Sequence, residues 1–351
     1  MSSDEAGEAG REHEPIRVAI ACQGGGSHTA FTAGVLRGLF REWDDERFEL
    51  VGISGTSGGA FNAVVAWYAL VTHGPELAVE RLADLWAELA ADDPVDGWVN
   101  AVSVWGAMVS DMGAPTPRPS PYAVPATYLG QRRIGRILSS LVDFDDVPAH
   151  CTHTDPELVV GTVDVEGGVF ETFHNEDVTR DAVLASAAVP ELFPAVEIDG
   201  HGHWDGLFSQ NPPVLDLLTV PADRKPEEVW VVQINPQDHD DIPKTPEAIA
   251  DRRNELSGNL SLNQELRFVH WVNEWVRAGH LPSAEFVETT VRRIELDEHF
   301  DPSSKLDRSP AFLEDLLDRG ERAGESFLAA YPETPTPVSA HGDYPDHGGN
   351  H

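Results

Sequence analysis

The sequence predicts an α/β fold with a mainly parallel or mixed central sheet and helices on both faces. Short apolar runs rich in Val and Ile recur along the chain, and amphipathic helical segments separate them. Glycine-rich turns join the first two of these runs to the helices that follow. With 351 residues, 41% of them hydrophobic, the chain is long enough to bury a large core.

The first half of the chain alternates clearly between the two kinds of element. Strands are expected at 17–22 and 48–53, and helices at 29–43, 60–70 and 76–89. Residues 92–127 are rich in Pro, Gly and Trp and show no periodicity. This segment is expected to be either a lid or binding loop, or a short helix at 98–108 that packs on the core.

The second half continues the alternation, with hairpin signals between the helices. Strands are expected at 158–165, 168–174, 196–198, 202–204, 228–234 and 290–296, and helices at 133–141, 179–188, 245–279 and from Ser309-Pro310 onward. Because the apolar segments run on to residue 328 without a long polar gap, we expect one domain at 15–331. The acidic segment 1–14 and the Pro-, Gly- and His-rich tail 332–351 are expected to be disordered.

The charge balance is strongly acidic. There are 60 acidic and 24 basic residues, three of the latter being lysines, and the net charge is −36. Such a surface repels itself unless salt screens it, which predicts a protein from a halophile. No basic stripe is present to neutralise phosphates, so a nucleic-acid partner is excluded. An anionic membrane would repel the chain as a whole at low salt.

The number of cysteines and the length of the apolar segments predict where in the cell the protein is found. Cys22 and Cys151 are the two cysteines, too few for a disulfide framework, and they fit a reducing environment. The acidic start is unlike a secretory signal, and the longest apolar stretch, 63–72, is about half of a membrane span. The sequence therefore predicts a cytoplasmic protein whose membrane contact is at most peripheral and transient.

Ser57 lies in the first motif that carries chemistry, a G-x-S-x-G at 55–59. It stands between a predicted buried strand and an apolar helix, the context in which this motif forms a sharp turn that exposes the serine. Small residues at Gly55 and Gly59 avoid clashes across such a turn. The positive end of the helix dipole would then favour a serine alkoxide. These features favour a nucleophile over a glycine-rich loop with a capping serine.

Gly24, Gly25 and Gly26 form a second motif, again between a strand and a helix. Consecutive glycines let backbone N–H groups point one way and cradle an anion. A dinucleotide pyrophosphate fits poorly, because the third glycine of G-x-G-x-x-G is missing at Thr29. The oxyanion of an acyl-transfer intermediate fits if parallel strands bring Ser57 to the same sheet edge.

Taken with Asp205-Gly206, which alone would be called a turn, these motifs make the chain resemble the patatin-like phospholipase family. The resemblance runs from Val18 to about Leu328. The stretches that carry it are GGGSHTAFTAGVL (24–36), GISGTSGGAFNA (52–63), ASAAVPELFPAV (185–196), DGLFSQNPPV (205–214) and KLDRSPAFLEDLL (305–317). Their order along the chain is more specific than any one of them.

The resemblance implies a patatin-like three-layer α/β/α fold and a serine acyl-ester hydrolase of the phospholipase A or lysophospholipase type. It implies a dyad of Ser57 and Asp205, with an oxyanion hole at Gly24 to Gly26 and acyl lipids or small esters as substrates. No cofactor and no metal are implied. A free Asp is a weak base, so burial must raise the Asp205 pKa and water must be excluded.

The chain departs from the family pattern at His28, where an Arg is usual, and at Thr29 and Leu207, where small residues are usual. His28 could assist the oxyanion if protonated, or it could be structural. His203 is expected to line the pocket. Two alternatives stay open: a Ser-His-Asp esterase that uses a later histidine such as His239 or His270, and a non-catalytic lipid-binding module of the same fold.

Overall fold

The computed structural model describes residues 14–92, 97, 100, 120–190, 192–238, 242–282, 284–298 and 300–331. Within this part, eight strands form one sheet in the order β5-β6-β3-β2-β1-β7-β8, with β4 paired to β3. The strands are β1 (Ile16–Cys22), β2 (Phe48–Gly55), β3 (Glu157–Asp164), β4 (Val169–His174), β5 (Val196–Ile198), β6 (His201–Asp205), β7 (Glu228–Gln233) and β8 (Thr290–Glu295).

The centre of the sheet is parallel and one side of it is antiparallel. The strand β1 pairs in parallel with β2 and β7, and the pairs β2–β3 and β7–β8 are parallel too. The pairs β3–β4, β3–β6 and β5–β6 are antiparallel. Parallel neighbours place the carboxyl ends of β1 and β2 together, which positions the glycine loop after Cys22 next to the turn after Gly55.

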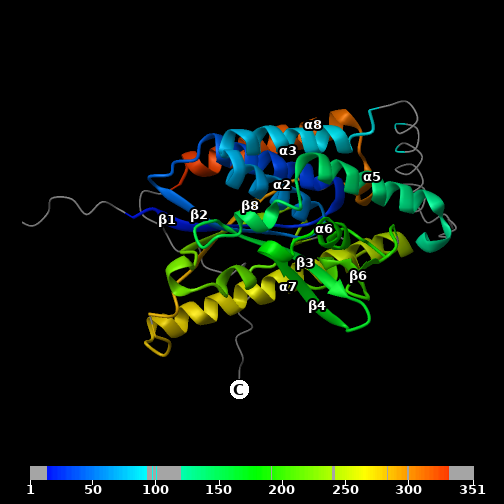
Figure 1. The fold of residues 1–351 in the computed structure, drawn as a ribbon. Coiled ribbons are helices and arrows are strands. Elements are labelled where there is room, and N and C mark those ends of the chain that lie inside the picture. Colours follow the sequence, from blue (N-terminus) through cyan, green and yellow to red (C-terminus); the bar gives the residue numbers. More distant parts are fainter. Residues whose placement is uncertain are drawn as a thin grey trace, which may run out of the picture.

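Helices cover both faces of the sheet (Figure 1). They are α1 (Thr29–Arg41), α2 (Gly58–His73), α3 (Pro75–Leu89), α5 (Pro125–Leu141), α6 (Arg180–Ser186), α7 (Pro246–Arg277) and α8 (Pro310–Ala329). In Figure 1, α3 and α8 lie above the sheet and α7 runs below it. The predicted α/β fold with a mixed, mostly parallel sheet is therefore confirmed.

The strand β1 shows how the two layers of core arise. Val18 and Ile20 belong to the larger core, which also contains residues of α1, α2, α3 and α8. Ala19 and Ala21 point to the other face, against a smaller core that contains Leu262 of α7. All four residues of the strand are fully buried. Because both faces of this strand are buried, its sequence is a continuous apolar run rather than an alternating one.

The helices α1 and α8 cross unusually closely because each has two glycines one turn apart. A Cβ on Gly34 or Gly38 of α1 would lie 2.1 or 2.3 Å from a carbonyl oxygen of α8. A Cβ on Gly320 or Gly324 of α8 would lie 2.0 or 2.5 Å from a carbonyl oxygen of α1. Only glycine permits this backbone approach. The crossing joins the helix that follows the glycine loop to the last described helix.

Element boundaries differ from prediction by a few residues, with one larger difference at α5. This helix begins at Pro125, well before the predicted start at 133, because a proline at the first helical position is preorganised for a helix. The lid or short helix predicted within 92–127 lies largely outside the described residues, as do 1–13 and 332–351. Within the described residues, no helix is both long enough and apolar enough to cross a membrane.

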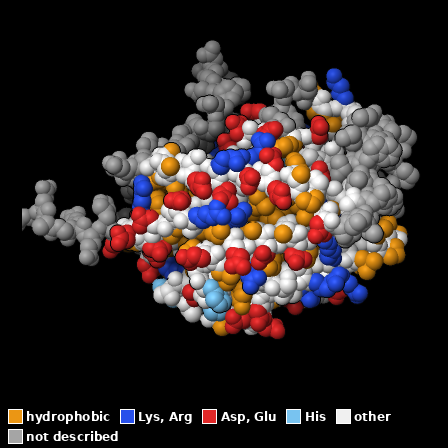
Figure 2. Space-filling model, turned by 90° about the horizontal axis from the view of Figure 1, so that it is seen from above, with side chains coloured by type: hydrophobic (Ala, Val, Ile, Leu, Met, Phe, Trp, Pro, Cys, Tyr) orange, Lys and Arg blue, Asp and Glu red, His pale blue; other side chains and the backbone are white. Residues whose placement is uncertain are grey.

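Acidic side chains are spread over the face formed by the upper helices, with Arg and Lys between them (Figure 2). Some of these charges pair, as Arg319 of α8 does with Asp315, at 2.7 Å between Nε and Oδ2. An exposed pair of this kind contributes about 1 kcal/mol or less to folding. The charge of this face therefore affects solubility far more than stability.

Candidate active site

Ser57 occupies the turn between β2 and α2 with a strained backbone. Its φ is 57° and its ψ is −130°, a region that side chains rarely adopt. The residue caps α2, and its carbonyl oxygen accepts hydrogen bonds from the amides of Ala60 and Phe61 at 2.9 and 3.2 Å. Ser57 is 8% exposed. A serine held in this way at a helix N-terminus lies in the positive end of the helix dipole.

Glycines on both sides of the turn make this conformation possible. A Cβ on Gly55 would lie 2.4 Å from the carbonyl oxygen of Gly59, and one on Gly59 would lie 2.2 Å from the carbonyl oxygen of Cys22. A Cβ on Gly24 would lie 2.7 Å from the Cβ of Ser57. The glycine loop and the serine turn are therefore in direct contact, as the parallel pairing of β1 and β2 led us to expect.

Asp205 is the last residue of β6 and is fully buried. Its Oδ1 accepts a hydrogen bond from the amide of Leu207 at 2.8 Å. Burial raises the pKa of this carboxyl group to about 7, while the Leu207 amide and the Ser57 hydroxyl lower it. Its Oδ2 is buried and receives no well-aligned hydrogen bond within the described residues. The Ser57 hydroxyl lies close enough to this carboxyl group to affect its pKa.

Two hydroxyl groups, one in β2 and one in the turn after it, hold the segment after Asp205 against the serine turn. The Oγ of Ser54 donates to the carbonyl oxygen of Pro213 at 2.5 Å, and the Oγ1 of Thr56 donates to that of Gln210 at 2.7 Å. A Cβ on Gly206 would lie 2.5 Å from the carbonyl oxygen of Gly161 and 3.0 Å from the Cγ2 of Thr56. The glycine after Asp205 is therefore required for this close approach.

The glycine loop presents two free amides. The Gly24 amide donates to the Oδ1 of Asn211 at 2.6 Å, and the Gly24 carbonyl oxygen accepts from the Nδ2 of Asn235 at 2.8 Å. The amides of Gly25 and Gly26 donate to no acceptor within the described residues. The φ of Gly26 is 63°, in the left-handed region that favours glycine. Of the three predicted glycines, these two can therefore hold an anion without losing another bond.

Sequence reasoning missed three residues that support the site. Asn211 and Asn235 hold Gly24 from both sides. Ser186, in α6, accepts a hydrogen bond from the Ser57 amide at 3.0 Å and donates to the carbonyl oxygen of Gly161 at 2.7 Å. Each lies within or next to a stretch that had been singled out, but a partner more than a hundred residues away leaves no local signal.

His28 is 4% exposed, and its ring packs against Phe300 with 5.2 Å between centroids. Its Nε2 lies 2.7 Å from the Oγ of Ser304. Burial, followed by the nearby charge of Lys305, lowers the pKa of His28 to about 3. The imidazole is therefore neutral and cannot supply a cation to an oxyanion near neutral pH.

Of the other candidate histidines, His203 and His270 lie within the described residues. The Nε2 of His203 is 2.8 Å from the Oε2 of Glu171, and its side chain is buried. His239 lies outside the described residues. His270 is on α7, about 18 Å along the helix from Gly258, which contacts Asn211. Within the described residues, no histidine is a hydrogen-bond partner of Ser57 or Asp205.

A group of possible metal ligands lies at the β3–β4 hairpin. Asp164, Glu166 and His201 offer ligand atoms within 4.8 Å of one another. These atoms already have partners, since the two oxygens of Asp164 contact the Gly167 amide and the His201 ring, at 2.8 and 3.0 Å. The group forms no part of the dyad region.

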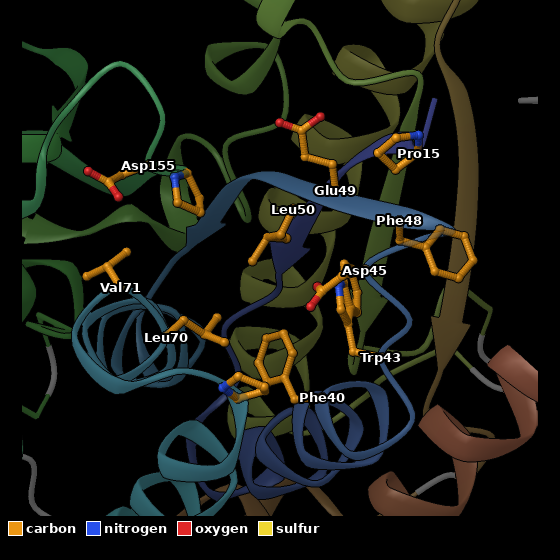
Figure 3. Close-up of a pocket in the computed structure, with 12 residues that line it drawn as sticks. Pro15, Phe40, Trp43, Asp45, Phe48, Glu49, Leu50, Leu70, Val71 and Asp155 are labelled. Atoms are coloured by element: carbon orange, nitrogen blue, oxygen red, sulfur yellow. The ribbon is translucent and has the colours of Figure 1, made fainter. Parts of the chain in front are cut away.

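A cavity of about 450 Å³ lies at the opposite end of the strands (Figure 3). Its walls are mainly apolar and include three carboxylates. They are formed by Pro15, Phe40, Trp43, Asp45, Phe48, Glu49, Leu50, Leu70, Val71, Pro75, Asp155 and Pro156. Phe48 and Leu50 lie at the start of β2, whereas Ser57 follows its end. No predicted site residue lines this cavity.

The chain is similar in sequence to one protein family. The family model described as patatin-like phospholipase matches residues 20–218. The crystal structure of VipD from Legionella pneumophila is similar over 90% of this chain and 67% of that chain, at 13% identity and a TM-score of 0.43. The type III effector protein ExoU is similar over 90% of this chain and 53% of that chain, at 13% identity and a TM-score of 0.34. The chain thus spans about half the length of ExoU. Among curated proteins, none matches the chain.

Proposed function

The chain belongs to the patatin-like phospholipase family, and we propose that it is a serine acyl-ester hydrolase acting on lipids. Ser57 is the nucleophile and Asp205 is the general base. The observation that carries this proposal is the buried Oδ2 of Asp205, which has no aligned partner and adjoins a serine in a strained turn. A buried polar atom without a partner is costly unless a function requires it.

The geometry supports a two-step reaction. The Ser57 hydroxyl transfers its proton to Asp205 as Oγ attacks the ester carbonyl carbon, and the carbonyl oxygen becomes an oxyanion. The amides of Gly25 and Gly26 hold that oxyanion. Its collapse breaks the ester bond, and the leaving alcohol takes the proton from Asp205. Water then loses a proton to Asp205, attacks the acyl group and releases the fatty acid, and Ser57 regains its proton.

Burial makes a single carboxylate sufficient as the base. An ordinary Asp, with a pKa near 3.8, would hold the serine proton weakly, but the pKa of Asp205 is about 7. It is therefore still ionised to a useful extent near neutral pH and accepts a proton more readily. No histidine is required in this scheme, which is why we favour it over a Ser-His-Asp triad.

The substrate class follows from the family, and the working conditions follow from the charge. We propose acyl lipids of the phospholipase A or lysophospholipase type, with small esters as model substrates. The net charge of −36 leads us to propose a halophilic protein, and the presence of two cysteines leads us to propose a cytoplasmic one. Assays therefore belong in molar salt, where the Debye length is about 3 Å and self-repulsion is screened.

Two variants test the dyad. We expect Ser57→Ala and Asp205→Asn each to abolish hydrolysis of p-nitrophenyl acyl esters while the circular dichroism spectrum is unchanged. The matched controls are Ser140→Ala and Asp145→Asn, both exposed and remote from the dyad, which should retain full activity. Substantial activity in either dyad variant would refute the mechanism.

A fluorophosphonate probe distinguishes a serine hydrolase from a non-catalytic lipid-binding module of the same fold. In the unmodified protein the probe should attach covalently to Ser57, and mass spectrometry of the digested protein identifies the residue. An unlabelled Ser57 in a folded protein, together with intact lipid binding, would favour a lipid-binding module.

A further inference from the structure

The outer face of α7 is apolar although it faces solvent. Five large apolar side chains of this helix are 40 to 50% exposed. They are Ile249, Leu260, Phe268, Trp271 and Trp275. At 100° per residue they fall within about 100° of one another around the helix axis. We call this set the α7 stripe.

The stripe lies directly opposite the face that packs on the sheet. Leu262, Leu266 and Val269 are 1 to 2% exposed and form the smaller core with β1 and β7. The helix is therefore apolar on two sides, whereas an ordinary surface helix has one apolar side. Two tryptophans in the last two turns make the exposed side unusual for a soluble face.

The charges beside the stripe reverse those of the whole chain. Acidic residues outnumber basic ones 60 to 24 overall. At 100° per residue, the exposed Arg253 and Arg267 fall within the stripe, whereas Arg277 lies outside it and pairs with Glu274 and Glu288. Asp251 and Glu255 instead turn to Lys305, and Glu265 is buried. A helix with aromatic residues and arginines on one side is suited to an anionic lipid surface.

The inner side of α7 contacts the segment that follows Asp205. A Cβ on Gly258 would lie 2.8 Å from the Nδ2 of Asn211, the residue that holds Gly24. Ser261 donates a hydrogen bond to the carbonyl oxygen of Ser209, four residues after Asp205. The inner side of α7 therefore contacts the catalytic region, while its outer side presents the stripe.

We propose that the α7 stripe is the surface by which the protein docks on anionic lipid, with α7 lying in the plane of the headgroups. Trp271, Trp275 and Phe268 enter the boundary between headgroups and acyl chains, and Arg253 and Arg267 contact lipid phosphates. This proposal rests on the proposed function, since it supplies the route by which an acidic protein reaches a lipid substrate.

Vesicle flotation tests the docking directly. The probes are vesicles of phosphatidylcholine alone and of phosphatidylcholine mixed with phosphatidylglycerol, at low and at molar salt. In molar salt, where the repulsion between the acidic chain and the lipid is screened, we expect the protein to float with the mixed vesicles and Trp271→Ala/Trp275→Ala to reduce the bound fraction by about tenfold. The matched control is Phe170→Ala, whose ring is 64% exposed on the β3–β4 hairpin and should have no effect.

A charge variant gives an independent test that does not disturb packing. Arg267→Glu should lower the fraction bound to the mixed vesicles but not the fraction bound to phosphatidylcholine alone, whereas Arg322→Glu, at an exposed position of α8 on the other face, should change neither. The variant Ser57→Ala should float like the unmodified protein, so docking is measured even if the proposed catalysis fails. Flotation of Trp271→Ala/Trp275→Ala equal to that of the unmodified protein would overturn the proposal. So would a dimer that the same variant dissociates without any change in vesicle binding, because the stripe would then be a contact between two copies.

Discussion

The two ends of the parallel strands carry very different features. At the amino ends of β1 and β2 there is a roomy cavity of about 450 Å³ whose lining shows no strained backbone among the described residues. At the carboxyl ends there are a serine with φ of 57°, a buried carboxyl group with a pKa of about 7 and two unoccupied amides. The strained backbone and the unsatisfied polar groups therefore mark the carboxyl ends as the candidate site.

The largest expected effect comes from adding a side chain to Gly24, where the glycine loop touches the serine turn at the carboxyl ends of β1 and β2. In Gly24→Ala, the new Cβ would lie 2.5 Å from the Thr56 carbonyl oxygen and 2.7 Å from the Ser57 Cβ. We expect kcat for a soluble ester to fall by about a thousandfold, because both the serine and the oxyanion amides shift. The control is Gly130→Ala, whose Cβ would meet a ring carbon of Phe193 at an ordinary 3.5 Å. Equal activity in the two variants would show that the close packing has no catalytic role.

The next effect concerns the support of the glycine loop. Asn211→Ala removes the acceptor of the Gly24 amide. The glycine loop then loses one of the hydrogen bonds that fix its conformation. We expect kcat to fall by about ten- to a hundredfold with a small change in KM, because the donors serve the transition state. Asn211→Asp keeps the acceptor and should recover part of the activity. A rise in KM alone would place Asn211 in substrate binding.

The pH dependence should follow Asp205. The carboxyl group must be ionised to act as a base, so kcat should rise as the pH rises through about 7 and level off above it.

The contribution of Asp205 to the free energy of unfolding should change with pH in the opposite direction to kcat, because the pKa of Asp205 in the folded state is raised above its ordinary value. The stabilising contribution is complete below about pH 4 and is lost as the pH rises through about 7. Asp205→Asn should therefore be inactive but more stable at alkaline pH, by a few kcal/mol, as thermal unfolding would reveal. A rate profile without a step near pH 7 would argue against Asp205 as the base.

The smallest effect is expected at the amino end. Val71→Trp should fill the cavity and leave ester hydrolysis within about twofold, because the cavity lies at the far end of β2 from Ser57. Thermal unfolding verifies that the larger ring is accommodated. A strong rise in KM for long acyl chains would show that this cavity receives part of the substrate, and the contrast between the two ends would fail.

Most of the fold could be predicted from the sequence because its signals are local. Buried strands such as Arg17 to Cys22 are continuous apolar runs, and the turn at Ser57 is marked by small residues. Asp205 carries no such signal, since a single Asp-Gly is an ordinary turn, and only the resemblance in motif order pointed to it. The roles of Asn211 and His28 could not be predicted, because they depend on partners 187 and 276 residues away.

The close crossing of α1 and α8 affects how the chain folds during its synthesis. The glycine loop and α1 lie within residues 24–41, yet their neighbours include the carbonyl oxygen of Lys305 and the backbone of α8. A ribosome makes these partners after Asp205, so a nascent chain that already contains both Ser57 and Asp205 still lacks the helix that fixes α1. The proposed hydrolytic activity should therefore be absent from such a growing polypeptide and arise only when α8 has emerged and docked.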